Sequence, residues 1–472
     1  MTDGPIMLTT TTDDAIGTSD TTDLRHRLRA GEVSPAEVRQ AASDRLDASR
    51  NALNAVVCPM DGAADADPDP EGPFAGIPLP IKDNDDVAGY PTSWGSNAFG
   101  PQPAEASSVF VRQLLQLGFS PLAKTTMPEF GLTATTQSVR FGDTRNPWDL
   151  ARSVGGSSGG SAALVAAGVV PMAHSNDGGG STRIPAATCG LVGLKPSRAR
   201  LIDRPELERA PVNLFTQGVL TTTVRDTAAY YSAAEQCYRN PDLPPIGQVT
   251  APMDQPLRIA VVTDGLSGIA IDPESLAAVG AAASLCESLG HHVALVANPY
   301  PDRLARDFLR YWSLLAYAFK RFGKVMYGPE FDGTRTDSFT DGLAAMFSQQ
   351  AERVPGSVRR LRRWARQGPP LLDEYDVVLG ATLGHPAPLL EWLSPDTPFR
   401  LHMTRLLRYV TATPLENVTG VPAISLPLGR TADQLPVGVQ FSAARGAEAL
   451  LLALALQLEA AAPWPRTPPS PG

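Results

Sequence analysis

Cysteine is scarce in this chain, which has only four among 472 residues: Cys58, Cys189, Cys237 and Cys286. Their scattered spacing fits neither a disulfide framework nor a Cys-x-x-Cys motif. No cluster of cysteine, histidine and carboxylate residues has the spacing of a metal site. We therefore expect a cytoplasmic protein that uses no metal ion and no other cofactor.

Long apolar runs and an excess of positive charge are also missing. No segment approaches the roughly 20 apolar residues that cross a bilayer, and residues 1–20 lack the pattern of a signal peptide. With 40 basic and 49 acidic residues the net charge is −9, which disfavours nucleic acid or an anionic membrane as a partner. No Gly-Lys-Ser/Thr triplet follows a glycine cluster, so a phosphate-binding P-loop is excluded.

Glycine, proline and apolar residues are plentiful. The 41 glycines and 44 prolines indicate many turns, and an apolar content of 43 % suffices for a large core. Segments typical of strands, such as 77–81 and 257–262, alternate with helical ones, such as 109–118 and 273–289. This alternation predicts an α/β fold with a mixed sheet.

The chain divides into six expected parts. They are a disordered N-terminus (1–20), an N-terminal helical segment (21–73), a core that carries the glycine clusters (74–298), a helical insertion rich in arginine and aromatic residues (299–370), a C-terminal part of the core (371–465) and a tail (466–472).

Two clusters of glycine and serine lie within one short stretch, Arg152–Ser197. The first is Gly155–Gly160 and the second is Gly178–Ser181. Glycine is used where the backbone takes a positive φ or comes very close to another group. Because an Ala/Val segment at 162–167 with the character of a buried helix joins the clusters, we expect both to be held rigidly.

The second cluster allows two interpretations. Consecutive N–H groups at Gly178, Gly179, Gly180 and Ser181 can converge on one anionic oxygen, or the run is a glycine turn with Ser181 capping a helix. Ser157 in the first cluster is open to three: nucleophile, proton relay or helix cap.

A serine nucleophile needs a base. Lys82 is one of few lysines in an arginine-rich chain and follows an apolar run; burial would leave such an amine neutral and basic. The alternative is a structural lysine paired with Asp83 or Asp85. A competing motif is Gly-x-Ser-x-Gly at 155–159, the nucleophile elbow of α/β-hydrolases, which would need a later histidine such as His385 or His402.

The longer motifs of the sequence resemble those of a known family. The stretch GGSSGGSAALVAAGVVPMAHSNDGGGSTRIPAATCGLVGLKPS is similar to the signature of the amidase signature family. The segments GPFAGIPLPIKDN, LLQLGFSPLAKTTMPEFG, NVTGVPAISLPLG and LPVGVQF match its other strands, so that the likeness covers roughly 25–465. It implies the amidase signature fold, in which helices cover both faces of the mixed sheet.

The resemblance also implies roles for individual residues. Ser181 is the expected nucleophile, Ser157, preceded by a cis peptide bond, the bridging serine, and Lys82 the base. The N–H groups of Gly178, Gly179, Gly180 and Ser181 would form the oxyanion hole. The residues expected to fix these loops are Ser158, Asp177 and Arg183.

Within the family the sequence is most similar to hydrolases of cyclic nylon-type amide dimers. Gly178 and Gly179 replace bulkier alanines, and Leu132, beside Gly131 at the substrate site, replaces a polar residue. We therefore expect hydrophobic or aryl amides as substrates, with carbamates, urethanes and esters as further possibilities. Six large apolar residues of the insertion would either line or cover the pocket or pack between its helices: Phe308, Tyr311, Trp312, Tyr317, Phe319 and Met326.

Two other roles remain open at this stage. One is the amidase subunit of a glutamine-dependent tRNA amidotransferase, and the other is a scaffold without activity. A homodimer is the assembly that the resemblance implies.

Overall fold

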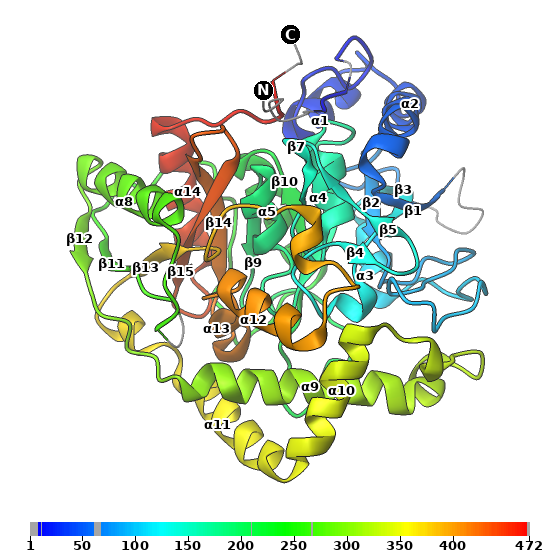
Figure 1. Ribbon diagram of the computed structural model, residues 1–472. Helices are drawn as coiled ribbons and strands as arrows, with labels where there is room; N and C mark the ends of the chain where they lie inside the picture. Colours follow the sequence, from blue (N-terminus) through cyan, green and yellow to red (C-terminus); the bar gives the residue numbers. More distant parts are fainter. Residues whose placement is uncertain (1–7, 11, 61–67, 209, 266–267, 470–472) are drawn as a thin grey trace, which may run out of the picture.

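The computed structural model describes residues 8–10, 12–60, 68–208, 210–265 and 268–469 (Figure 1). Its helices are α1 (Thr21–Arg29), α2 (Pro35–Leu53), α3 (Val109–Gln116), α4 (Gly159–Ala166), α5 (Arg183–Cys189), α6 (Pro205–Glu208), α7 (Val224–Cys237), α8 (Pro273–Ser288), α9 (Arg303–Tyr327), α10 (Ser338–Gln350), α11 (Val354–Gln367), α12 (Phe399–Tyr409), α13 (Pro414–Thr419) and α14 (Glu448–Ala461). Its strands are β1 (Val56–Pro59), β2 (Pro78–Lys82), β3 (Ser120–Thr125), β4 (Gln137–Ser138), β5 (Gly142–Asp143), β6 (Arg145–Asn146), β7 (Asp149–Ser153), β8 (Met172–Asp177), β9 (Val192–Lys195), β10 (Thr216–Thr221), β11 (Arg258–Val262), β12 (His292–Leu295), β13 (Val377–Ala381), β14 (Ala423–Arg430) and β15 (Pro436–Ala443).

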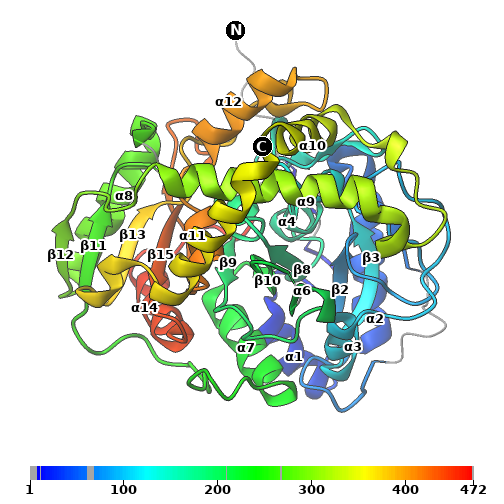
Figure 2. The same ribbon diagram turned by 90° about the horizontal axis from the view of Figure 1, so that it is seen from below.

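An eight-stranded mixed sheet forms the centre, in the order β12-β11-β13-β15-β14-β9-β10-β8. Strand β11 is parallel to β12 and β13, and the remaining neighbours are antiparallel. A separate three-stranded sheet has the order β1-β3-β2. Helices α4 and α8 lie on one side of the strands and α7 and α14 on the other, as the view from below shows (Figure 2). The predicted α/β class, with helices on both faces of a mixed sheet, is confirmed.

Local sequence signals account for several elements. The Ser34 side chain caps α2, and the Ser34 N–H donates to the Glu37 carboxylate. At the other end, Asn54 terminates the helix in a left-handed conformation with φ of 50°. All eight residues of α4 are buried, as the Ala/Val segment predicts. The core continues through the apolar faces of β9, β14 and β15.

The strand that leads to the second glycine cluster lies later than the sequence predicts. The apolar residues at 169–172 predict a strand there, but β8 runs through Met172–Asp177. Its side chains His174, Ser175 and Asn176 are polar and yet buried. Because these residues form hydrogen bonds inside the protein, the strand lacks the apolar pattern by which buried strands are recognised.

The prediction of disorder over 1–20 is wrong for the described part of that segment. The Leu8 N–H donates to the carbonyl of Pro147 at 2.8 Å, and Ile16 is buried in the core. Asp14 forms an ion pair with the buried Arg45 at 2.6 Å. A Thr/Asp-rich composition therefore conceals a segment with specific partners. Residues 1–7 and 11 lie outside the described residues.

The insertion region holds the helices α9, α10 and α11, of which α10 and α11 each pack on α9. They lie across the lower end of the sheets in Figure 1. Strand β13, from the C-terminal part, lies between β11 and β15 in the large sheet. The segments 74–298 and 371–465 therefore share one sheet.

Candidate active site

Lys82 ends β2 with its side chain completely buried. Its Nζ lies 2.8 Å from Ser157 Oγ and donates to Asn176 Oδ1 at 2.7 Å. Neither neighbouring carboxylate pairs with this amine: Asp83 lies 3.4 Å from Lys124 Nζ, and Asp85 lies 3.1 Å from Arg204. The interpretation of Lys82 as a lysine paired with Asp83 or Asp85 is therefore wrong.

The protonation of Lys82 follows from its burial. Desolvation lowers the pKa of Lys82 to about 7, although the carboxylates of Asp177 and Asp85 act in the opposite direction. An amine with this pKa is largely neutral in mildly alkaline solution. A neutral amine can accept a proton from the serine hydroxyl beside it.

Ser157 lies between Lys82 and the loop that carries Gly131 and Leu132, called the substrate loop. The Gly156–Ser157 peptide bond is cis, as the family resemblance implies. Gly131 approaches so closely that a Cβ added there would lie 3.0 Å from Ser157 Oγ. The next N–H, of Ser158, donates to the carbonyl of Ser181 at 3.2 Å. The two serine clusters, 24 positions apart in the sequence, are thus in contact.

Ser158 makes further contacts with the strand that leads to the nucleophile candidate. Its hydroxyl donates to the carbonyl of Asn176 at 3.3 Å and lies 3.4 Å from the Asn176 N–H. Ser158 thus joins the first serine cluster to β8.

Ser181 lies between β8 and α5 and is 8 % exposed. Of the four N–H groups predicted to form an oxyanion hole, that of Gly180 has another partner, since it donates to Asp177 Oδ1 at 2.7 Å. The prediction is wrong for Gly180, because the Asp177 carboxylate within the turn accepts its N–H. Gly178, Gly179 and Ser181 remain as prospective donors.

A buried ion pair supports the same turn. Arg183 Nε lies 2.9 Å from Asp177 Oδ2, and its other nitrogens reach Glu416, Gln440, Asn417 and the carbonyl of Thr413, each at 2.8 Å. Burial alone would raise the pKa of Asp177, but Arg183 holds it well below its usual range. All of these partners are buried, so the pair keeps the glycine turn rigid.

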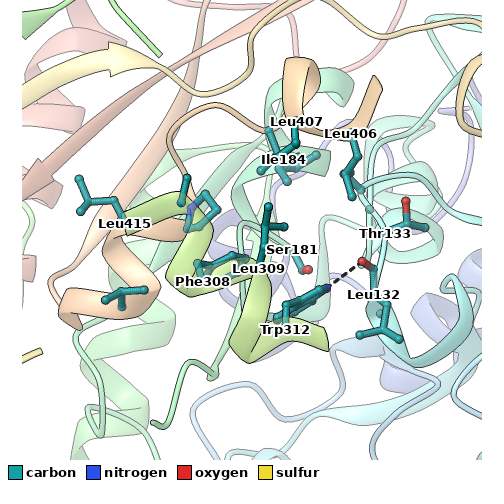
Figure 3. Close-up of a pocket in the computed structure, with 18 of the residues that line it drawn as sticks. Leu132, Thr133, Ser181, Ile184, Phe308, Leu309, Trp312, Leu406, Leu407 and Leu415 are labelled. Atoms are coloured by element: carbon teal, nitrogen blue, oxygen red, sulfur yellow. Dashed lines mark hydrogen bonds between the residues drawn. The ribbon is translucent and has the colours of Figure 1, made fainter. Parts of the chain in front are cut away.

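An apolar pocket of about 170 Å³ opens in front of Ser181 (Figure 3). Gly131, Leu132, Gly156 and Gly179 contribute to its wall. Most other lining residues are apolar: Ile184, Leu304, Phe308, Leu309, Trp312, Leu406, Leu407, Val410, Leu415 and Val418. Among the described lining residues only Arg306 carries a charge, and it is exposed. The pocket therefore offers an acyl group a dry surface.

Helix α9 supplies part of that wall and also supports the substrate loop. Trp312 Nε1 donates to the carbonyl of Leu132 at 3.0 Å, the dashed line in Figure 3. The Trp312 ring stacks on Phe308 with centroids 5.3 Å apart. Of the six insertion residues expected at the pocket, Phe308 and Trp312 line it, whereas the others do not. Tyr311 instead bonds to Val212, and Met326 is 49 % exposed.

The histidines required by a nucleophile elbow are elsewhere. His385 contacts the carbonyl of Pro386, and His402 Nε2 lies 2.9 Å from Thr133 Oγ1. Ser157 has Lys82 as its side-chain partner. The α/β-hydrolase interpretation is therefore wrong.

The sequence does not indicate a site role for two residues near Lys82, namely Asn176 and His174. Asn176 contacts the Lys82 amine, and His174 Nδ1 accepts from the Lys82 backbone N–H at 3.1 Å. The available signal is polar side chains at alternate positions of a buried strand, which place both residues on one face.

Known proteins are similar to this chain in sequence and in fold along nearly its whole length. The Amidase family model matches residues 37–452. AmiC of Mycobacterium tuberculosis, which bears the name of an amidase, is 47 % identical over 96 % of this chain and 97 % of its own.

Solved structures are similar as well. A 6-aminohexanoate cyclic dimer hydrolase complexed with substrate superposes with a TM-score of 0.84 at 32 % identity, covering 95 % of this chain and 98 % of the other. A bacterial aryl acylamidase gives a TM-score of 0.81 at 25 % identity, over 94 % and 96 % of the two chains.

The family model covers most of the chain, including the lysine strand, both serine clusters and the strands behind them. The relatives extend over the same range. This chain belongs to the amidase signature family of hydrolases.

Proposed function

We propose that this amidase cleaves the carbon–nitrogen bond of hydrophobic or aryl amides through an acyl-enzyme on Ser181. Ser157 and Lys82 complete a Ser-cisSer-Lys triad. Carbamates and esters with similar acyl groups are further substrates, because the same attack applies to their carbonyls.

The observation that carries the proposal is the 2.8 Å contact between the buried Lys82 amine and Ser157 Oγ, next to the pocket that Ser181 faces. A lysine amine that burial makes neutral can take the proton of a hydroxyl beside it. The two serine loops are joined by the Ser158-to-Ser181 backbone bond, and in the relay that we propose the proton passes from one serine to the other.

Acylation proceeds by a proton relay. Ser181 Oγ attacks the substrate carbonyl while its proton passes to Ser157 Oγ and the Ser157 proton passes to Lys82 Nζ. The negative charge that develops on the carbonyl oxygen is stabilised by N–H groups of the glycine turn, with Gly178, Gly179 and Ser181 as donors. As the C–N bond breaks, the relay runs backwards and the departing amine takes the proton.

Deacylation repeats the relay with water. Ser181 Oγ is now the leaving group, and a water molecule gives its proton to the neutral Lys82 through Ser157. The carboxylic acid leaves, and Ser181 recovers its proton. Each cycle consumes one amide and one water and releases one acid and one amine.

The substrate class follows from the pocket wall. An apolar side chain gains roughly 25 cal/mol per Å² of surface that it removes from water, and this pocket offers mainly such surface. Glutamine, the substrate of a tRNA amidotransferase subunit, carries an ammonium and a carboxylate. The described lining residues do not include charged partners for both of these groups, so the role of an amidotransferase subunit is disfavoured.

A substrate panel tests the proposal. Short aliphatic amides, long-chain amides, anilides, carbamates and aryl esters are compared with wild type and with Ser181→Ala. We expect kcat/KM to rise with the apolar area of the acyl group, and Ser181→Ala to be inactive on every substrate while keeping the wild-type melting temperature. Activity confined to free glutamine, or a fully active Ser181→Ala, would contradict the proposal.

Lys82→Ala provides the control on the relay. We expect it to lose at least about a hundredfold in kcat, the usual contribution of a general base, while it continues to bind substrate. A scaffold without activity would leave every member of the panel intact, including activated aryl esters.

A further inference from the structure

The catalytic lysine lies where two sheets meet without pairing. Strand β2 is at the edge of the three-stranded sheet, and β8 is at the edge of the eight-stranded sheet. They lie side by side in the view from below (Figure 2). No backbone-to-backbone hydrogen bond joins β2 to β8 within the described residues. This contact, called the inter-sheet seam, must be fixed by side chains.

Two side chains of β8 hold Lys82 across the seam. His174 Nδ1 accepts the Lys82 backbone N–H at 3.1 Å, and Asn176 Oδ1 accepts from Lys82 Nζ at 2.7 Å. Both belong to the same face of the strand. His174 thus holds the backbone of the lysine, and Asn176 holds its amine.

The remaining contacts of His174 fix its proton. Asp85 Oδ2 lies 3.2 Å from Gln217 Nε2 and 3.1 Å from Arg204. A carboxylate only accepts, so it orients the Gln217 amide with its NH₂ towards Asp85 and its Oε1 towards His174 Nε2, which lies 3.1 Å away. The Nε2 atom therefore carries the hydrogen, and Nδ1 is left as an acceptor for the Lys82 N–H.

The surroundings favour this neutral form. The His174 ring is completely buried and packs against Phe110 of α3, with ring centroids 5.1 Å apart. Burial lowers the pKa of His174 to about 4, against the effect of Asp85. Above about pH 5 the ring therefore has a fixed hydrogen-bond polarity.

We propose that His174 is a positioning residue for the catalytic lysine, acting as an Nε2–H imidazole that clamps the Lys82 backbone across the inter-sheet seam under the orientation of Gln217 and Asp85. The inference rests on the proposed function, because it assigns Lys82 the role of base. His174 reaches the backbone of Lys82 rather than the reacting atoms, so it exchanges no proton with substrate.

Two substitutions separate this role from simple packing. The Asn side chain can place its oxygen where Nδ1 lies, whereas the longer Gln side chain places its polar group where Nε2 lies. We expect His174→Asn to keep kcat within about threefold of wild type, and His174→Gln to lower kcat by roughly 10- to 100-fold with little change in KM, as expected when a reacting group is displaced by up to an ångström.

The pH profile supplies a second measurement. The charged or titratable groups that act on the Lys82 amine are Asp177, Asp85 and Arg204, with His174 neutral beside it. If the seam loosens in His174→Gln, water reaches the amine and its pKa rises. The acid limb of kcat/KM then moves upward by about one pH unit, whereas His174→Asn keeps the wild-type limb. Equal kcat values and equal limbs in the two variants would overturn the proposal.

A third measurement does not depend on activity. In the ¹⁵N spectrum of histidine-labelled protein, the His174 signals are assigned by their loss in His174→Asn. We expect one ring nitrogen with an attached proton and one without, unchanged between about pH 6 and 8. A doubly protonated or exchanging ring would overturn the inference, whereas failure of the proposed function would show itself as an active Ser181→Ala with this spectrum intact.

Discussion

A single buried amine decides the chemistry at the residue scale. Among the residues that the structure describes, no carboxylate pairs with Lys82, and the hydrogen-bond partners of its amine are a hydroxyl and an amide oxygen. Sequence spacing alone cannot distinguish this lysine from a paired one, because Asp83 and Asp85 follow it directly. The distinction arises from Lys124 and Arg204, which lie far along the chain and take those carboxylates.

The pH dependence of turnover is the first prediction. The relay needs neutral Lys82, and burial lowers the pKa of Lys82 to about 7. Activity is therefore full above that value and falls as the pH decreases through it, by about tenfold per unit. The measurement is kcat/KM on a neutral anilide between about pH 5 and 9. A flat profile across neutrality would remove Lys82 as the base.

Asn176 gives the second prediction. Replacing it by the isosteric Asp puts a carboxylate against the Lys82 ammonium, which raises the pKa of Lys82 by about 1–3 units. The acid limb should move to higher pH, and activity at neutral pH should fall at least about fivefold. Asn176→Ala is the control, since it removes the acceptor without adding charge and its limb should not move upward. A limb left at the wild-type position in Asn176→Asp would contradict the account.

At the element scale, helix α9 connects the insertion to the catalytic loops. Trp312 holds the Leu132 carbonyl, and the neighbouring Gly131 packs against Ser157 Oγ. Phe308 packs near the oxyanion turn, because a Cβ added at Gly179 would lie 3.3 Å from its ring. The insertion thus bears on the acyl pocket and on the catalytic serines together.

Trp312→Phe tests that connection. The change keeps an aromatic ring but leaves a buried carbonyl without its donor, an effect of about 1–2 kcal/mol. We expect kcat/KM on hydrophobic amides to fall by roughly 5- to 30-fold. Tyr311→Phe is the matched control on the same helix. It removes two hydrogen bonds with the Val212 backbone outside the pocket, so the melting temperature should fall while kcat/KM stays constant. Equal kinetic effects of both changes would count against a role of Trp312 in the loop.

The elements that the sequence predicts well are those with a clean apolar pattern. The helices near 109–118 and 273–289 and the strand near 257–262 lie close to where α3, α8 and β11 are found. Strand β10 and helix α7 have no counterpart in the prediction, and β8 is displaced. Strands β8 and β10 carry the buried polar residues His174, Asn176 and Gln217. The buried polar residues that build the site thus remove the apolar pattern from which its strands could be predicted.

At the scale of the whole molecule, the N-terminal segment is part of the packed structure. Arg45 is buried and contacts Asp14 together with the carbonyls of Gly17 and Gly168. Composition suggests disorder there because the partners of Asp14 and Ile16 lie in distant parts of the chain. Long-range pairing of this kind leaves no local signal.

Removal of residues 1–17 is the corresponding prediction. It removes the Asp14 carboxylate and the Gly17 carbonyl, which pair with the Arg45 guanidinium, together with the buried Ile16 side chain, so the free energy of unfolding should fall by about 3–5 kcal/mol. The measurement is the urea midpoint, and kcat at 25 °C should be unchanged in the protein that remains folded. Asp14→Ala should reproduce part of the loss. A truncated protein with the wild-type midpoint would show that this segment is dispensable.

Much of the site could be named from the sequence, because the motifs around Lys82, Ser157 and Ser181 are long and resemble a known family. The hydrogen bond of the Gly180 N–H to Asp177 could not, since it depends on how one carboxylate turns within its loop. The contact between Lys82 and Asn176 depends on two sheets meeting without a backbone ladder. Such geometry emerges only from the assembled fold.

The covalent intermediate is the most direct test of the account. Wild type, Ser157→Ala and Ser181→Ala are treated with a fluorophosphonate or an activated aryl ester, and the modified residue is mapped by peptide mass spectrometry. We predict one adduct, on Ser181, formed quickly in wild type, slowly in Ser157→Ala and not at all in Ser181→Ala. An adduct on Ser157, or labelling that survives in Ser181→Ala, would contradict the account.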